Sequence, residues 1–278
     1  MHIGLVLGGG GGRCLAHIGV MQALEEKDIQ VDAIAGSSTG AILGALFAAG
    51  YPAMEVRRIV KETNLLGLLS PTVNLAGGLT DQDGVAELLG QHLPETFEEL
   101  GIPFAATATD IQKGEMVVLT RGPLARAVCA SNAFPGVFEA ERLNGRYLID
   151  GGTLNNLPVD IITTLTEAPV LAADVSPSAS RPLSFSESDS LWGTVQDAVK
   201  GQVVLPTTML RKAYIISQAF IIDARLEKDP PAVLLRPEFP EDFGIATFNR
   251  LDEAVSIGYK AAVEMLEREG DKLKSKSL

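Results

Sequence analysis

The chain of 278 residues has a hydrophobic fraction of 46% and a charged fraction of 21%, values that exclude a disordered or fibrous protein. Its 23 Lys and Arg residues are outnumbered by 35 Asp and Glu residues, so the formal net charge is −12. A nucleic-acid-binding protein needs basic residues in excess on at least one face, and this chain has neither that excess nor a long basic run. Nucleic acid is therefore excluded as a partner.

The first fifty residues contain two strand–turn–helix units. In each unit a short apolar run is followed by a glycine-rich turn and then by apolar residues at helical spacing. The strands, turns and helices are expected at residues 3–7, 8–12 and 13–26, and again at residues 31–35, 36–40 and 41–49. Two such units predict an α/β fold in which helices cover a parallel sheet.

Further along the chain the elements are shorter. Thr80, followed by Asp81 and Asp83, is typical of a helix N-cap with an acidic first turn, and this helix should run through residue 93. The remaining strands are expected at residues 104–109, 116–120, 146–149, 170–174 and 233–236. The remaining helices are expected at residues 124–130, 159–165, 190–226 with a break at Pro206, and 251–269, with a surface loop at residues 176–190.

Cysteine usage and the apolar segments bear on the compartment. Cys14 and Cys129 are too far apart in sequence to indicate a disulfide framework, which favours a reducing compartment. The apolar run at residues 3–7 is too short for a signal peptide and has no basic segment before it. Glycines and Pro52 interrupt the uncharged window at residues 33–54, which favours a buried strand, turn and helix over a membrane span. A cytoplasmic location is the resulting expectation.

The pentapeptide at residues 36–40 reads G-S-S-T-G and satisfies the pattern G-x-S-x-G with Ser38 at its centre. A nucleophilic serine needs a tight turn between a strand and a helix, because this turn lifts its hydroxyl above the sheet. Gly36 and Gly40 would relieve the crowding where the helix packs back on the strand. Ser38 is therefore a candidate nucleophile, with a plain glycine-rich turn as the alternative.

The five glycines at residues 8–12, followed by Arg13, form a second strand-to-helix turn. Such a turn presents backbone N–H groups to an anion, which is either a bound phosphate or the oxyanion of a tetrahedral intermediate. The dinucleotide pattern G-x-G-x-x-G would need a glycine where the chain has Arg13, Cys14 and Leu15, and no Gly-Lys pair is present for a P-loop. The pattern therefore favours an oxyanion hole over a nucleotide site.

The three histidines do not supply an obvious general base. In the order Ser, Asp, His of the α/β-hydrolases a histidine follows the acid, and His92 is the only histidine beyond Ser38. His92 is better explained as a surface residue at the end of an amphipathic helix. Carboxylates are therefore the candidates for the base.

Asp150 is the carboxylate that stands out. An apolar strand delivers it to a turn in which Gly151 and Gly152 allow another backbone to approach closely. Many Asp-Gly pairs are only turns, as at Asp83, so a turn is the alternative for this motif taken alone.

Five blocks in order resemble the patatin-like phospholipase family. They read GGGGGR at residues 8–13, LAHIGV at 15–20, GSSTG at 36–40, SNAFPGVF at 131–138, and DGG with NNLP within residues 150–158. The resemblance implies a three-layer α/β/α fold with a mainly parallel central sheet. It also implies a single catalytic domain over residues 1–278, in which residues 3–175 carry the motifs and residues 176–278 complete the domain with helices and a cover.

The resemblance also implies roles for individual residues. Ser38 would be the nucleophile and Asp150 its proton acceptor, a serine–aspartate dyad. The backbone of Gly9, Gly10, Gly11 and Gly12 would form the oxyanion hole, with Arg13 supporting that loop. The family hydrolyses acyl esters of phospholipids, lysophospholipids or neutral lipids, and its small bacterial-type members use no metal, so neither a metal nor a cofactor is expected.

One position departs from the family pattern. The glycine loop of the family usually reads G-G-G-x-R-G, and Cys14 stands in its last place. This cysteine either changes the geometry of the oxyanion hole or fills the space as a buried small thiol. The alternatives to a lipid acyl hydrolase are therefore a short-chain carboxylesterase, a non-hydrolytic protein that binds a lipid or another partner, and a nucleotide-binding protein.

The expected partner is a lipid or ester substrate, reached by transient apolar contact with a membrane because the net charge of −12 disfavours docking on anionic lipid. The uncharged stretch at residues 64–80 and the segment at 203–210 have the composition of a lid or acyl-chain wall, with core packing as the alternative. The oligomeric state is not predicted.

Overall fold

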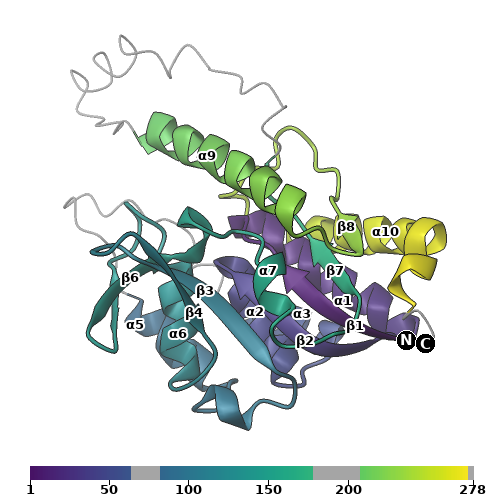
Figure 1. Ribbon diagram of the computed structural model, residues 1–278, viewed down its shortest axis with the longest axis horizontal. Helices are drawn as coiled ribbons and strands as arrows, with labels where there is room; N and C mark the ends of the chain where they lie inside the picture. The colour runs from purple at the N-terminus through teal and green to yellow at the C-terminus, as the bar shows by residue number, and fades with distance from the viewer. Residues whose placement is uncertain (64–81, 178–206, 275–278) are drawn as a thin grey trace.

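A computed structural model of the chain describes residues 1–63, 82–177 and 207–274. It shows a mixed α/β fold in which helices cover both faces of a central sheet (Figure 1). The strands are β1 (His2–Leu7), β2 (Gln30–Ser37), β3 (Phe104–Asp110), β4 (Glu115–Leu119), β5 (Glu141–Leu143), β6 (Arg146–Asp150), β7 (Val170–Ala173) and β8 (Val233–Leu235). The α-helices are α1 (Ala16–Glu26), α2 (Thr39–Ala48), α3 (Ala53–Glu62), α5 (Asp83–Gly90), α6 (Leu124–Asn132), α7 (Val159–Ile162), α9 (Thr207–Lys228) and α10 (Leu251–Glu269).

The strand order is β5-β6-β3-β2-β1-β7-β8, with β4 also paired to β3. The neighbouring pairs from β3 through β2, β1 and β7 to β8 are parallel, and the pairs that involve β4, β5 and β6 are antiparallel. The sheet is therefore mainly parallel, as expected, with an antiparallel end.

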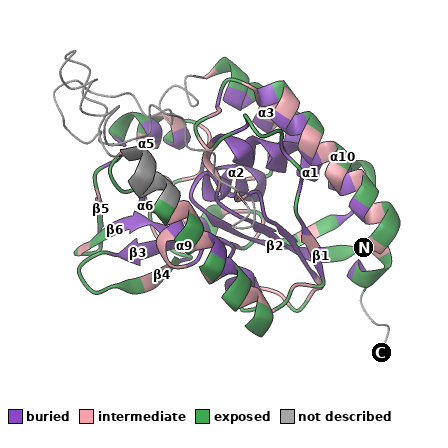
Figure 2. Cartoon of the chain, turned by 90° about the horizontal axis from the view of Figure 1, so that it is seen from above, coloured by how far each residue is buried: buried purple, intermediate pink, exposed green. Residues whose placement is uncertain are grey.

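Side-chain alternation along the strands divides the core into two layers. In β1, Ile3, Leu5 and Leu7 face the layer that contains α1, α2, α6 and α10, whereas Val6 faces α7 and the buried Ile222 of α9. Figure 2 shows buried residues concentrated in the central strands and in α1 and α2, with exposed residues on the outer helices. The predicted three-layer α/β/α arrangement is confirmed.

The register of the antiparallel end brings two strand ends together. Strand β2 runs parallel to β3 and ends with Ser37 opposite Thr107, whereas β6 runs antiparallel to β3 and ends with Asp150 opposite Ala108. Because β4 pairs with residues 106–110 of β3, β2 and β6 must share the other edge of that strand. The carboxyl ends of β2 and β6 therefore meet one residue apart along β3.

The predicted elements are confirmed with differences at their ends. The helix expected at residues 13–26 begins as a 3-10 turn, η1 (Gly11–Leu15), before α1, and the helix expected at residues 159–165 ends as α7 at Ile162. Helix α3 and strand β5 were not predicted. Thr80, the stretch 64–80 and most of the loop 176–190 lie outside the described residues.

The C-terminal elements that are described join the same core. Strand β8 pairs with β7, and α10 packs closely along α1. The single domain over residues 1–278 stays a prediction. Among the described helices, none has the length and apolar character needed to cross a membrane.

Candidate active site

Ser38 lies at a sharp turn between β2 and α2, with φ 55° and ψ −137°. Residues with a side chain rarely adopt this conformation, so the backbone is strained at this position. A Cβ at Gly36 would lie 2.8 Å from Cα of Ala41, and one at Gly40 would overlap the carbonyl of Leu7. The two glycines therefore allow the close packing that forms the turn.

The Ser38 hydroxyl points at the end of β6. Its Oγ donates a 2.7 Å hydrogen bond to Oδ2 of Asp150, and the N–H of Gly152 donates to Oδ1 of the same carboxylate at 2.7 Å. The backbone N–H of Ser38 donates to Oγ of Ser131 at 3.0 Å. The structure thus brings together the two residues that sequence reasoning singled out, and hydrogen bonds orient both.

Asp150 is fully enclosed, with 1% of its surface exposed. Burial raises the pKa of Asp150 from 3.8 to about 6, although the hydrogen bonds from Ser38 and Gly152 act in the opposite direction. Desolvation disfavours the charged form of a carboxyl, which makes the carboxylate a stronger base. At neutral pH the group is still ionised and can accept a proton.

The glycine loop lines the same cavity as Ser38. The N–H of Gly9 donates to the carbonyl of Asn156 at 3.1 Å, and the N–H of Gly12 donates to a carbonyl ahead of α10 at 2.7 Å. Gly10 and Gly11 stand at the start of η1, where no carbonyl of the preceding turn can accept their N–H groups. Within the described residues, Gly10 and Gly11 are therefore the donors of this loop that remain for an oxyanion.

Arg13 and Cys14 lie behind this loop. The guanidinium of Arg13 stacks 4.2 Å above the ring of Phe239, and its side chain is buried. The thiol of Cys14 is fully buried and donates to the carbonyl of Gly8 at 3.4 Å. Burial raises the pKa of Cys14 far above its usual range, so it remains a neutral thiol that packs against the loop.

Sequence reasoning assigned no role to two further residues that hold the loop. Nε2 of His17 lies 2.8 Å from the carbonyl of Gly8, and burial lowers the pKa of His17 to about 4, so the neutral ring donates this bond. Nδ2 of Asn156 donates to the carbonyl of Gly9 at 3.0 Å. Both residues lie within the LAHIGV and NNLP blocks, which were the only signal for them.

A cavity of about 100 Å³ opens above Ser38 and Asp150. Apart from the glycines, Ser38 and Asp150, its lining is mainly apolar and comprises Thr39, Asn132, Phe134, Val137, Phe138, Asn156, Pro177, Ile215, Gln218, Ile245, Ala246 and Phe248. Ile215 and Gln218 belong to α9, so this helix closes one side of the cavity. Within the described residues, no group of three or more His, Cys, Asp or Glu side chains could hold a metal ion.

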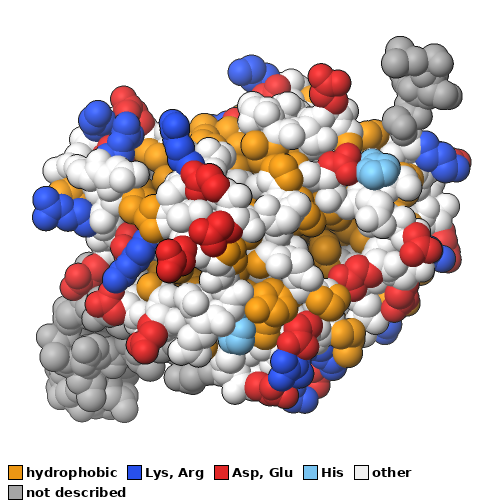
Figure 3. Space-filling view, turned by 90° about the horizontal axis from the view of Figure 1, so that it is seen from below, with side chains coloured by type: hydrophobic (Ala, Val, Ile, Leu, Met, Phe, Trp, Pro, Cys, Tyr) orange, Lys and Arg blue, Asp and Glu red, His pale blue; other side chains and the backbone are white. Residues whose placement is uncertain are grey.

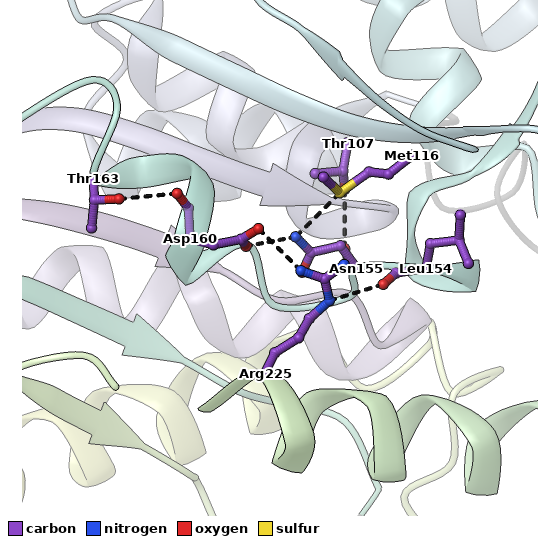
Figure 4. Close-up of polar contacts among 7 residues, drawn as sticks. All are labelled: Thr107, Met116, Leu154, Asn155, Asp160, Thr163 and Arg225. Atoms are coloured by element: carbon purple, nitrogen blue, oxygen red, sulfur yellow. Dashed lines mark hydrogen bonds and ion pairs between the residues drawn. The ribbon is translucent and has the colours of Figure 1, made fainter. Parts of the chain in front are cut away.

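Polar contacts tie α9 to the loop that follows Asp150 (Figure 4). Arg225 donates from Nε to the carbonyl of Leu154 at 3.1 Å and pairs with Asp160 at 3.0 Å. The amide of Asn155 donates to the same Asp160 carboxylate at 2.7 Å, and Thr107 donates to the carbonyl of Asn155 at 3.1 Å. This network holds residues 151–156 between β3 and α9.

Relatives of the chain have this type of site. An uncharacterized NTE family protein of Mycobacterium tuberculosis is 38% identical over 190 residues, which cover 66% of this chain and 52% of that protein. Lysophospholipase NTE1 of Pyricularia oryzae is 31% identical over 284 residues, which cover 96% of this chain and 18% of that protein. The chain thus spans about half the length of the mycobacterial relative that it matches and less than a fifth of the fungal one.

Among solved structures, VipD from Legionella pneumophila shares the fold, with a TM-score of 0.52 at 17% identity over 96% of this chain and 67% of that chain. The model of the patatin-like phospholipase family matches residues 5–163, which include Ser38, Asp150 and the glycine loop. The resemblance expected from the five sequence blocks is confirmed, and the chain belongs to the patatin-like phospholipase family.

Proposed function

We propose that the chain is a lipid acyl hydrolase that cleaves carboxylic esters of phospholipids, lysophospholipids or neutral lipids with a serine–aspartate dyad. The observation that carries the proposal is the 2.7 Å hydrogen bond from Oγ of Ser38 to the buried carboxylate of Asp150. Membership in the patatin-like phospholipase family and the printed name of the fungal relative, lysophospholipase, support the substrate class.

In the proposed mechanism, Oγ of Ser38 attacks the ester carbonyl while its proton passes to Asp150. The N–H groups of Gly10 and Gly11 stabilise the oxyanion, a contribution of about 3 kcal/mol for each such donor. Asp150 then gives the proton to the leaving alcohol, and an acyl-enzyme remains. Water attacks this ester, its proton passes to Asp150 and then to Ser38, and the fatty acid leaves.

The dyad is tested by comparing S38A and D150N with the wild type on an aryl ester and on a lysophospholipid. We expect S38A to lower kcat by at least about 1,000-fold and to abolish labelling by a fluorophosphonate. D150N should lower kcat by about 100-fold or more, and the kcat/KM of the wild type should rise with pH through about 6, because only the carboxylate of Asp150 accepts the proton.

S37A is the matched control, since Ser37 is a buried serine next to the nucleophile whose hydroxyl has no partner among the described residues. It should keep kcat within about threefold, because it leaves the Ser38–Asp150 hydrogen bond intact. A folded S38A or D150N protein with the wild-type rate would remove the dyad. Failure of Ser38 to react with the fluorophosphonate would favour the non-hydrolytic alternative.

A second candidate function, a short-chain carboxylesterase, is favoured by the size of the cavity. Its volume of about 100 Å³ is small beside the roughly 300–1,000 Å³ of pockets that enclose a drug-sized ligand. A long acyl chain therefore needs α9 to move. A series of p-nitrophenyl esters from acetate to palmitate separates the two functions, because kcat/KM falls with chain length for the carboxylesterase and rises for the lipid hydrolase. A cytoplasmic location stays a prediction.

A further inference from the structure

Asn156 makes two hydrogen bonds to one residue of the glycine loop. Its backbone carbonyl accepts from the N–H of Gly9 at 3.1 Å, and its side-chain Nδ2 donates to the carbonyl of Gly9 at 3.0 Å. The side chain is buried, with 2% exposed. The peptide groups on both sides of Gly9 are therefore held by a single residue.

The second of these bonds also sets the direction of the next N–H group. In a trans peptide the carbonyl and the N–H point in opposite directions. Fixing the carbonyl of Gly9 toward Asn156 therefore directs the N–H of Gly10 away from Asn156. The neutral His17 holds the preceding carbonyl, that of Gly8, at 2.8 Å, so the chain entering the loop is fixed as well.

The amide of Asn156 also lies against the loop that carries the acid. A Cβ placed on Gly152 would come within 2.6 Å of Oδ1 of Asn156 and within 2.9 Å of Oδ1 of Asp150. A Cβ placed on Gly9 would overlap the same amide oxygen and come within 2.9 Å of Cβ of Ser38. The side chain of Asn156 therefore lies between the two loops whose separation matters for the reaction.

We propose that Asn156 is a positioning residue, which holds the oxyanion loop at the correct distance from Ser38 and Asp150. This inference rests on the proposed hydrolase function. An amide suits the position because its N–H group can donate to the carbonyl of Gly9. A carboxylate of the same shape would repel that carbonyl and the carboxylate of Asp150.

The test compares N156A and N156D with the wild type on a short aryl ester. The fraction of sites that react to completion with a fluorophosphonate serves to express kcat per intact site. We expect both variants to lower kcat by about 10–100-fold with KM changed less than about threefold, because donors to the transition state move while substrate binding persists. N156D should also shift the acid limb of the pH profile upward from about 6, since it adds a like charge beside Asp150, whereas N156A should leave the limb in place.

N155A is the matched control, since Asn155 is the preceding buried asparagine and contacts Asp160 rather than Gly9. N155A should lower the melting temperature while its kcat per intact site stays within about threefold of the wild type. N156D is nearly isosteric with the wild type, so it gives a result even if N156A does not fold.

The outcomes separate the positioning role from the proposed function. If the wild type hydrolyses the ester but N156A or N156D keeps kcat per intact site within twofold, the positioning role is overturned and the hydrolase stands. A loss of activity matched by an equal loss of intact sites also overturns it, because Asn156 would then only stabilise the fold. If the wild type neither hydrolyses esters nor labels at Ser38, the proposed function fails and this inference with it.

Discussion

Two buried titratable side chains flank the glycine loop, and burial moves their pKa values in opposite directions. The pKa of Asp150 rises to about 6 and that of His17 falls to about 4, because desolvation disfavours the charged form of either group. His17 therefore stays neutral and donates to Gly8, whereas Asp150 is ionised at neutral pH despite its burial. The ionised carboxylate and the strained backbone of Ser38 both lower the stability of the fold.

D150N should therefore stabilise the protein at alkaline pH. The pKa of Asp150 is higher in the folded chain, about 6, than its ordinary value of 3.8, so its contribution to stability is complete below pH 3.8 and is lost as the pH rises through about 6. Asparagine keeps the hydrogen-bonding shape without the buried charge. We expect D150N to raise the free energy of unfolding by about 1–3 kcal/mol at pH 8 and by little near pH 4.

Urea denaturation at pH 4, 6 and 8 measures this difference. His17 has the opposite sign: its lowered pKa gives stability that is present above pH 6.5 and lost as the pH falls through about 4. This contribution is common to both proteins and cancels in the comparison. A stability difference that does not change with pH would contradict the assignment of a raised pKa to Asp150.

At the scale of elements, local patterns predicted what is formed locally. The G-x-S-x-G turn at residues 36–40, with its strand and helix, follows from glycine spacing and apolar runs, and the structure has it. The meeting of β2 and β6 along β3 could not be predicted in this way, because it depends on the register between strands distant in sequence. The roles of His17 and Asn156 were equally inaccessible, since each is defined by the distant carbonyl that it holds.

The packing of α1 on α10 is an element-scale contact that the glycine loop depends on, because α1 follows that loop directly. A Cβ at Gly258 would overlap the carbonyl of Ala16, and one at Gly19 would overlap that of Val255. We expect G258A to lower the free energy of unfolding by about 1–3 kcal/mol or more, since the two helix backbones must separate. Chemical denaturation measures this loss.

G270A is the control for that substitution. Gly270 lies at the end of the same helix, with φ −56° and no atom within 4 Å of an added Cβ. Alanine fits this conformation, so G270A should be neutral or stabilising by up to about 1 kcal/mol. Equal losses in G258A and G270A would show that the close approach of α1 and α10 is unimportant for stability.

At the scale of the whole molecule, charge limits how the protein can meet a lipid surface. Figure 3 shows acidic and basic side chains close together around the edge of one face. Many arginines are paired with carboxylates, among them Arg58 with Glu55 and Glu62, Arg225 with Asp160, Arg236 with Asp174 and Asp223, and Arg250 with Asp242 and Glu253. These pairs neutralise basic groups that could attract anionic lipid, and the net charge of the chain is −12.

The proposed lipid hydrolase should therefore act faster on neutral surfaces than on anionic ones. Adding an anionic phospholipid to zwitterionic vesicles of the substrate lipid should lower the initial rate several-fold at low ionic strength, because the surface repels a chain of charge −12. Salt should restore much of the rate, since the Debye length falls from about 30 Å at 0.01 M to about 8 Å at 0.15 M. Hydrolysis of a soluble short-chain ester in the same mixtures is the control and should not depend on vesicle charge. A higher rate on anionic vesicles at low salt would mean that a local basic surface, rather than the net charge, directs the protein to lipid.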